Sequence, residues 1–342
     1  MRIGTNPAKG TKVEINDSYH RIIIPVYIPN LEDFFKESLG VLKLCLQSLY
    51  TTLHTKSKIT VVSNGSCNEV NEFLFKEQTK KNIDELFIIT SGIGKINSIR
   101  GALNNIKEPL VTLTDADVLF KSGWQEEVEQ IFIDYNKVGM ICPFSYTKGY
   151  RELTANIFFD NLFNKKIRIN PVKDKKDILH FAKSIGNPNF YKGIHLKKAI
   201  TYQEKGKSKV FIGAGHFVSS FRSSVFDYYT FKSFLNKMSD GERKFIDTPA
   251  VNFNLWRVST YRNYVYHMGN TLNDMYENVI KTNSNSNFKQ FNFNIKLRKT
   301  SKFLFFLKNK LFARVIYSNK IFPFFLRKIG LTKSEAKKYI RK

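Results

Sequence analysis

Two aspartates separated by a single residue carry the clearest chemical signal in this sequence. Asp115 and Asp117 follow an apolar run, and on an extended chain both side chains point to the same side. Two carboxylates held this close repel each other unless a cation lies between them. A hard divalent metal ion with a bound diphosphate satisfies both groups. The pair therefore indicates a metal–diphosphate site, and a solvated aspartate turn is the alternative.

Lys95 is a second candidate for binding an anion. It ends the segment Ser91-Gly92-Ile93-Gly94-Lys95, directly before a predicted helix. Glycine lets backbone N–H groups approach a phosphate closely, and a helix N-terminus attracts one. The spacing is that of neither a P-loop nor a dinucleotide-binding loop. We expect Gly94 and Lys95 to contact a phosphate, and a solvated lysine beside a loop is the alternative.

Short apolar runs alternate with amphipathic segments between residues 21 and 146. The expected strands are 21–29, 58–63, 85–90, 109–118 and 138–146, and the expected helices are 37–53, 69–79, 95–106 and 123–135. Strands that alternate with helices of this length form βαβ units with a parallel sheet, which binds ligands at the carboxyl ends of its strands. Asn64, Gly94, Lys95 and both aspartates fall at those ends, so the sequence predicts one shared site.

The second half of the sequence is less regular. Residues 146–209 contain an expected loop at Gly186-Asn187-Pro188 but no readable motif. Residues 211–221 are expected to form a glycine-hinged strand and residues 240–256 a helix interrupted at Pro249. Residues 263–270 are expected to form a short strand that enters a loop.

Four segments in this order resemble the opening half of a family 2-type glycosyltransferase with the GT-A fold: IIIPVYIPN, VVSNGS, GIGKINSIRGAL and LVTLTDADV. The resemblance covers roughly residues 21–269. It implies an α/β fold with a Rossmann-like, mostly parallel central sheet flanked by helices. It also implies a catalytic domain at 1–279, with a nucleotide-binding half near 20–146 and an acceptor half near 147–279. A basic, aromatic-rich helical extension at 280–342 would follow.

The resemblance also implies which residues surround the nucleotide. The end of the first strand would line the pocket through Pro25, Val26 and Tyr27. Family members usually carry acidic residues at the end of the second strand, where this chain has Ser63 and Asn64. Asn64 is the expected contact there, and this departure leaves the base of the nucleotide open, with a UDP-sugar favoured.

The aspartate pair matches the metal-binding motif of the same family. The resemblance implies that Asp115 contacts the ribose or the metal shell, with Ala116 beside it, and that Asp117 ligates the metal. His267, in the later segment Tyr266-His267-Met268, would be a further ligand. Imidazole suits Mn²⁺ better than Mg²⁺, although either divalent metal is an expected cofactor. A histidine packed among aromatic residues is the alternative interpretation.

The resemblance further implies an acidic general base facing the acceptor. The segment 239–247 offers Glu242, Asp240 and Asp247, ranked in that order, and each alone resembles an ordinary surface acid. The base must be ionised and within reach of the acceptor hydroxyl. The acceptor side is expected to include Gly213, Gly215 and His216.

These roles imply one reaction, transfer of a sugar from a nucleotide-sugar to a hydroxyl of a glycan or lipid-linked acceptor. Its transition state would resemble an oxocarbenium ion, as in glycoside hydrolysis. The metal and Lys95 would stabilise the leaving diphosphate. Direct attack would invert the anomeric configuration, which the resemblance to a hexosyltransferase (EC 2.4) implies. Synthesis of a cell-envelope polysaccharide is the expected setting.

The charge of the chain is concentrated at its C-terminal end. From Lys281 to Lys342 there are 17 Lys and Arg against one acid, Glu335, so this segment holds +16 of the net charge of +26 and leaves +10 for the rest. Aromatic clusters alternate with the basic residues from Asn287 onward. Such a segment suits an anionic membrane surface. Packing of its aromatic residues onto the catalytic domain is the alternative.

The remaining composition limits the class of protein. A hydrophobic content of 42% indicates a folded chain. Three distant cysteines suggest neither zinc nor disulfides, and no signal peptide or membrane span is evident. We therefore expect a cytoplasmic protein, with a peripheral position on the inner face of the membrane as an option. A nucleic-acid-binding protein, a sugar-nucleotide nucleotidyltransferase and a non-catalytic glycan-binding relative remain as rivals, although no nucleic-acid signature is present.

Overall fold

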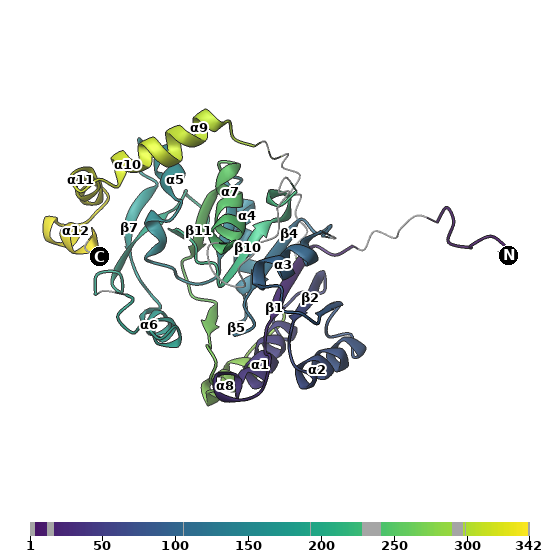
Figure 1. Cartoon of the computed structure of the whole chain (residues 1–342). Coiled ribbons are helices and arrows are strands. Elements are labelled where there is room, and N and C mark those ends of the chain that lie inside the picture. The colour runs from purple at the N-terminus through teal and green to yellow at the C-terminus, as the bar shows by residue number, and fades with distance from the viewer. Residues whose placement is uncertain are drawn as a thin grey trace.

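The computed structural model describes residues 4–11, 17–104, 106–191, 193–227, 241–288, 297 and 299–340. Its centre is a ten-stranded sheet with the order β3-β2-β1-β4-β10-β6-β11-β9-β8-β7 (Figure 1). The strands of the first half pair in parallel; they are β1 (His20–Val26), β2 (Ser57–Asn64), β3 (Glu85–Ile89) and β4 (Leu110–Thr114). Each matches an expected strand, with its ends shifted by a few residues.

Six further strands complete the sheet; they are β6 (Val138–Cys142), β7 (Ile167–Pro171), β8 (Lys198–Tyr202), β9 (Val210–Ile212), β10 (Val218–Arg222) and β11 (Trp256–Thr260). Strand β10 lies antiparallel between β4 and β6, while β11 is parallel to β6. From these pairings, strands β7, β9 and β10 are antiparallel to the other seven strands of the sheet. The predicted α/β fold with a mostly parallel sheet is confirmed.

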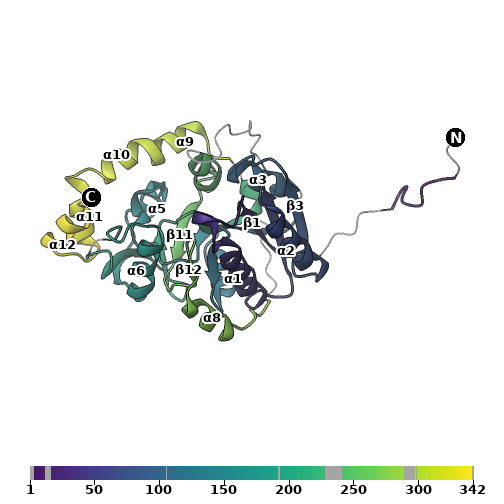
Figure 2. The same cartoon turned by 60° about the horizontal axis from the view of Figure 1, so that its bottom comes forward.

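Helices connect and flank the strands; they are α1 (Ser38–Tyr50), α2 (Asn68–Thr79), α3 (Lys95–Leu103), α4 (Trp124–Asp134), α5 (Ala155–Asp160), α6 (Lys175–Ser184), α7 (Thr248–Asn252) and α8 (Asp274–Lys281). Helix α3 packs on β1 and β2, and α4 packs on β6. Helices α1 and α8 pack against each other beside a small antiparallel sheet of β5 (Val118–Phe120) and β12 (Val265–His267) (Figure 2).

Strand β1 shows why the first half was readable from the sequence. Ile22, Ile23 and Ile24 are all completely buried, because a central parallel strand is covered on both faces. A continuous apolar run results instead of an alternating one. Helix α1 shows the complementary pattern, since Leu42 and Leu46 are buried one turn apart on a single face.

Three expectations for the second half were inaccurate. Residues 211–221 form two strands, β9 and β10, because Gly213 turns the chain between them with φ +108°. Pro249 lies in the first turn of α7, where proline is tolerated, and the expected helix ends before β11. Residues 146–209 are more ordered than expected, since they form α5, β7, α6 and β8.

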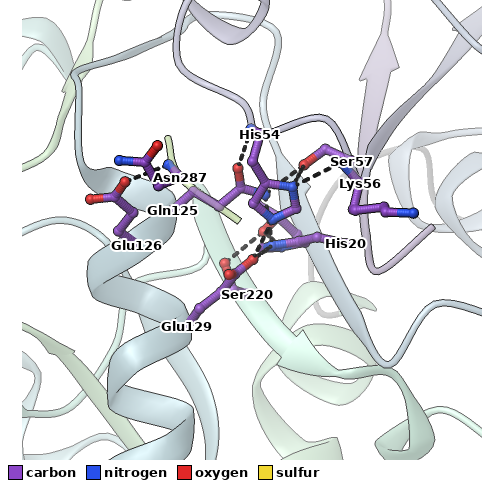
Figure 3. A network of polar contacts seen from close by, with 10 residues as sticks. His20, His54, Lys56, Ser57, Gln125, Glu126, Glu129, Ser220 and Asn287 are labelled. Atoms are coloured by element: carbon purple, nitrogen blue, oxygen red, sulfur yellow. Dashed lines mark hydrogen bonds and ion pairs between the residues drawn. The ribbon is translucent and has the colours of Figure 1, made fainter. Parts of the chain in front are cut away.

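A polar network is buried between β1 and α4 (Figure 3). Glu129 Oε1 lies 3.0 Å from both His20 Nδ1 and His54 Nε2. His54 Nδ1 accepts a hydrogen bond from the backbone N–H of Lys56, so His54 donates to Glu129 as a neutral ring. Burial lowers the pKa of His20, although the hydrogen bond to Glu129 opposes this shift. The network therefore holds one buried carboxylate with two imidazole donors.

The C-terminal extension packs against the edge of the sheet that carries β7 and β8 (Figure 1). Its helical segments are α9 (Lys302–Phe306), η5 (Leu307–Leu311), α10 (Phe312–Ile316), α11 (Ile321–Lys328) and α12 (Lys333–Ile340). The Tyr339 hydroxyl accepts a hydrogen bond from the backbone of Ile200, and Phe322 stacks on Tyr150. Within the described residues, no helix combines the length and apolar character needed to span a bilayer.

Candidate active site at the end of strand β4

The aspartate pair lies where β4 leaves the main sheet and the chain enters β5. The Asp115 backbone N–H donates to the Phe217 carbonyl at 2.8 Å, which fixes the end of β4 beside the start of β10. The Asp117 carbonyl accepts from the Met268 N–H at 2.8 Å, next to the pairing of Val118 with His267. These two backbone hydrogen bonds hold the aspartates in different places. Asp115 lies toward the loops of the main sheet, and Asp117 lies toward the small sheet.

Lys95 joins two acids that lie far apart in the sequence. Its Nζ lies 2.5 Å from Asp115 Oδ1 and 2.9 Å from Glu242 Oε1. Gly94, with φ +89°, turns the chain directly before α3 and so places Lys95 at the helix start. Burial disfavours the charged form of Lys95, but Asp115 and Glu242 outweigh burial and raise its pKa. Lys95 therefore carries a fixed positive charge between the expected donor side and the expected base.

A chain of ionisable groups continues from Glu242 to the acceptor side. His216 Nε2 lies 3.5 Å from Glu242 Oε2, and His216 Nδ1 lies 3.3 Å from Asp247 Oδ2. Asp247 belongs to a π-helical turn, η4 (Arg243–Asp247), which brings it back toward Glu242's side of the site. The hydrogen bond to Asp247 raises the pKa of His216, with burial opposing the shift.

Arg257 on β11 completes this chain, although no sequence motif points to it. Its Nη2 lies 2.5 Å from Asp247 Oδ1 and 2.9 Å from the Ala214 carbonyl, and its side chain is almost completely buried. Burial alone would raise the pKa of Asp247, but Arg257 and His216 hold it below its usual range. Arg257 directly follows the expected helix 240–256 and belongs to no motif, so only the fold identifies its partner.

Asp117 and His267 form a second polar pair in the site. His267 Nε2 lies 3.5 Å from Asp117 Oδ2, and the Asp117 Oδ1 atom is buried without a hydrogen-bond partner among the described residues. Burial raises the pKa of Asp117 to about 6; His267 opposes the shift and Asp115 adds to it. A buried carboxylate oxygen without a donor beside an imidazole is a fitting partial ligand set for a divalent cation.

The described side chains form no larger metal cluster. Within the part of the chain that the structure describes, no group of three or more His, Cys, Asp or Glu residues is placed to hold an ion. Asp115 is held by Lys95. Asp117 and His267 thus fit a metal only as two of its ligands, and further ligands would have to come from the diphosphate and water.

The other predicted nucleotide residues occupy different environments. The Asn64 side chain accepts a hydrogen bond from the Ile93 N–H at 2.8 Å, so it holds the glycine loop that precedes Lys95. Val26 is completely buried in β1, whereas Tyr27 is 48% exposed and contacts Phe35 edge to face. Pro25 lies within β1, one residue from its end.

The residues expected on the acceptor side differ in how closely they are packed. Gly213 passes so close to Gly149 that an added Cβ would lie 2.4 Å from the Gly149 carbonyl group, whereas a Cβ on Gly215 would meet nothing closer than 3.6 Å. Ala116 is partly buried and packs against the main core. Asp240 lies outside the described residues.

No family model and no curated protein matches this chain. It is similar to the solved structure of S. aureus TarS 1-349, with 14% identity and a TM-score of 0.42 over 73% of this chain and 60% of that chain. The same TarS fragment in complex with UDP-GlcNAc gives 13% identity and 0.42 over 94% and 70%. A mannosyltransferase from Pyrobaculum calidifontis, PcManGT, in complex with GDP-Man and Mn²⁺, gives 13% identity and 0.40 over 75% and 59%. Likenesses this distant assign no activity.

Proposed function

We propose that this protein is a metal-dependent glycosyltransferase that moves a sugar from a nucleotide-sugar, with a UDP-sugar favoured, to an acceptor hydroxyl. The observation that carries the proposal is the position of Lys95, whose ammonium contacts both Asp115 and Glu242. Asp115 belongs to the motif expected at the diphosphate, and Glu242 is the preferred candidate for the base. One cation thus links the two halves that a sugar-transfer site must bring together.

On the donor side, three groups have the chemistry that a sugar diphosphate requires. Asp117 and His267 would hold a Mn²⁺ or Mg²⁺ ion, which neutralises diphosphate charge when it is bound. Lys95 adds a permanent positive charge at the start of α3, where a diphosphate oxygen would also meet the helix dipole. Charge that develops on the leaving group would be stabilised by these fixed groups without reorganisation.

On the acceptor side, the contacts favour Glu242 over Asp247 as the base. Asp247 is buried and ion-paired to Arg257, and its lowered pKa makes it a poor proton acceptor. Glu242 is partly exposed, with one oxygen toward Lys95 and the other toward His216. When the donor diphosphate attracts Lys95, Glu242 would lose its strongest partner and become free to accept a proton. Asp240 remains a third candidate from the sequence alone.

The resulting transfer is a single displacement. Glu242 would take the proton from the acceptor hydroxyl while that oxygen forms a bond to the anomeric carbon. The bond from the anomeric carbon to the diphosphate oxygen breaks, and its electron pair stays on the diphosphate. Attack from the face opposite the leaving group would invert the anomeric configuration, as expected for a hexosyltransferase of this type.

The catalytic unit would comprise residues 1–279, and the C-terminal extension would bring it to its acceptor. Phe303 and Phe306 on α9 are 76% and 54% exposed, next to the basic residues Lys302 and Lys310. Exposed aromatic rings with neighbouring cations suit the surface of an anionic membrane. We therefore place the enzyme at the inner face of the membrane, on a glycan or lipid-linked acceptor of cell-envelope polysaccharide synthesis.

Calorimetric titration of the purified chain with UDP and GDP, each with and without Mn²⁺, tests the proposal. Micromolar binding that needs the metal and is lost in Asp117→Ala is the expected result, and it would identify the nucleotide. Glu277→Ala on α8 is the control, since it also removes one acid outside the site. If neither nucleotide binds, and CMP and dTDP fail as well, the glycosyltransferase proposal is wrong.

A further inference from the structure

A basic groove lies at the edge of the sheet, away from the residues of the candidate active site. It has a volume of about 610 Å³ and is formed by the end of β8, the start of β7 and the turn before β9. Its positive charges come from Lys165, Lys166, Arg168, Lys205 and Lys209. Glu204 is its single acidic lining residue within the described part of the chain.

Glu204 does not neutralise the groove. It is held by Lys166 at 2.8 Å and by Lys207 at 2.8 Å, and it also accepts from the Tyr202 hydroxyl at 2.6 Å. The hydrogen bond from Lys166 and those from Lys207 and Tyr202 lower the pKa of Glu204 to about 2. Its charge is thus already matched by these two lysines, and the remaining cations of the groove stay uncompensated.

Neutral partners orient two of those remaining cations, Lys209 and Arg168. Lys209 Nζ donates to Asn170 Oδ1 at 3.2 Å and lies 5.0 Å from the centre of the Tyr261 ring. Arg168 Nε donates to the Lys165 carbonyl at 3.1 Å, which leaves both terminal nitrogens of the guanidinium for another group. None of Lys165, Arg168, Lys205 and Lys209 forms an ion pair with a described acidic residue. The groove thus concentrates positive charge, and contacts with neutral groups define the orientation of two of its cations.

The groove shares a face of the sheet with Arg257. Arg168 pairs with Thr201, Thr201 with Phe211, and Phe211 with Ser259, and directly paired residues lie on the same face. Arg257 is two residues before Ser259 on β11, and side chains two apart point to the same side. Strands β8 and β11 are two positions apart, which is about 10 Å at the usual strand spacing. The groove is therefore on the side of the sheet that carries the Arg257–Asp247–His216 chain.

We propose that this groove binds the phosphate groups of a polyanionic acceptor chain while another part of that chain occupies the active site. A planar guanidinium and nearby ammonium groups are the standard partners of phosphate oxygens. Four uncompensated cations in one groove match several phosphates better than one. The identity of the ligand as an acceptor rests on the proposed function, whereas binding of a multiply charged oxyanion at this groove does not.

Titration with tripolyphosphate tests the groove directly, with the full chain and at one fixed ionic strength. The double variant Arg168→Ala/Lys205→Ala should bind tripolyphosphate roughly tenfold or more weakly than the parent chain. The matched control Lys337→Ala/Lys338→Ala removes the same charge from exposed positions on α12 and should change the affinity by less than about twofold. Equal weakening in both variants would show a general effect of net charge and overturn the proposal.

Two further titrations test the identity of the ligand independently of the proposed function. Orthophosphate should bind much more weakly than tripolyphosphate, and equal affinities would indicate a site for a single free phosphate and contradict the polyanion assignment. Binding of the nucleotide with Mn²⁺ should be unchanged in the groove variant. If no nucleotide binds but the groove variant still loses tripolyphosphate, the proposed function fails while the groove site stands. Matching melting temperatures of the variants establish that both are folded.

Discussion

The ring Nδ1 of His267 lies 2.9 Å from the Ser184 hydroxyl, and this contact fixes the tautomer of the histidine. The Ser184 hydroxyl donates its own proton to the Phe181 carbonyl at 3.0 Å, so it accepts from Nδ1–H. The neutral ring then carries its lone pair on Nε2, the atom that faces Asp117. Ser184 is thus a positioning residue for an imidazole that points toward the proposed metal.

Replacement of Ser184 by alanine should therefore weaken Mn²⁺ binding by roughly tenfold or more, as loss of such a supporting hydrogen bond commonly does. Calorimetric titration with Mn²⁺ in the presence of the nucleotide measures the effect. Ser184→Thr keeps a hydroxyl and should restore most of the affinity. Unchanged Mn²⁺ affinity in Ser184→Ala would mean that the contact is only structural.

Glu242→Gln should abolish most transfer without loss of nucleotide binding. Removal of a general base costs about 10²- to 10⁴-fold in kcat. Lys95 loses one of its two competing carboxylates in this variant, so the nucleotide should bind as tightly as before or more tightly. Release of nucleotide diphosphate under saturating donor and acceptor is the assay.

Asp247→Asn tests whether Asp247 or Glu242 is the general base. This change weakens the ion pair with buried Arg257, so its main effect should be a lower melting temperature. A loss of kcat in Asp247→Asn at an unchanged melting temperature, together with an active Glu242→Gln, would reverse the assignment of the base.

The buried network around Glu129 should make the fold sensitive to acid. The pKa of His20 is lowered in the folded state by burial, so below about pH 6.5 the unfolded chain binds a proton that the folded chain does not, and stability falls as pH falls. The pKa of Glu129 is also lowered, since the hydrogen bonds from His20 and His54 outweigh burial. Its contribution is present above about pH 4.5 and is lost as pH falls through the folded-state value.

Glu129→Ala should lower the free energy of unfolding by about 2–4 kcal/mol near neutral pH, because two buried imidazole N–H groups lose their acceptor. The variant should also lose the part of the acid dependence that this carboxylate causes. Urea unfolding between about pH 3 and 8 measures both effects. Glu126→Ala, one turn earlier on α4 and less buried, is the control (Figure 3). Parallel stability curves for all three proteins would contradict this account of the network.

Two glycines on the acceptor side should respond differently to alanine. Gly213→Ala forces a side chain into a backbone with φ +108° and into the Gly149 carbonyl group, so we expect a loss of about 2–4 kcal/mol in unfolding free energy. Gly215→Ala meets no atom closer than 3.6 Å and should remain close to the parent stability. Thermal unfolding compares them, and equal melting temperatures would refute the close approach of Gly213 to Gly149.

The exposed aromatic residues of the C-terminal extension should control membrane binding. Phe303→Ser/Phe306→Ser should reduce binding to vesicles that contain phosphatidylglycerol by roughly tenfold, because two apolar anchors are removed while all basic residues remain. Sedimentation with the vesicles measures this. Phe163→Ser, a change at a 98% exposed ring before β7, should have little effect. Equal binding of the parent chain and the double variant to these vesicles, or equally strong binding of the parent chain to neutral phosphatidylcholine vesicles, would exclude an anionic docking surface.

Local hydrophobic patterns in the sequence were sufficient to predict the first half of the fold. The apolar run Ile22–Ile24 and the helical spacing of Leu42 and Leu46 are patterns of hydrophobic residues within a few positions of one another. Such local patterns allowed the βαβ units and the parallel strands to be predicted. The location of Lys95 and Asp115 at strand and helix ends followed from those units. Their direct contact is a finding of the structure.

Contacts between distant residues depend on tertiary packing. Lys95 and Glu242 are separated by 147 positions, and the contact of Arg257 with Asp247 depends on a π-helical turn and on strand β11, neither of which has a periodic signal. The same holds for the basic groove. Its charges lie on β7, on the residues just before β7 and on the turn between β8 and β9, and antiparallel pairing brings these segments together. Residue types and local helices and strands can be read from neighbouring positions in the chain. The positions of charges relative to one another depend on packing between elements, which the order of residues does not state.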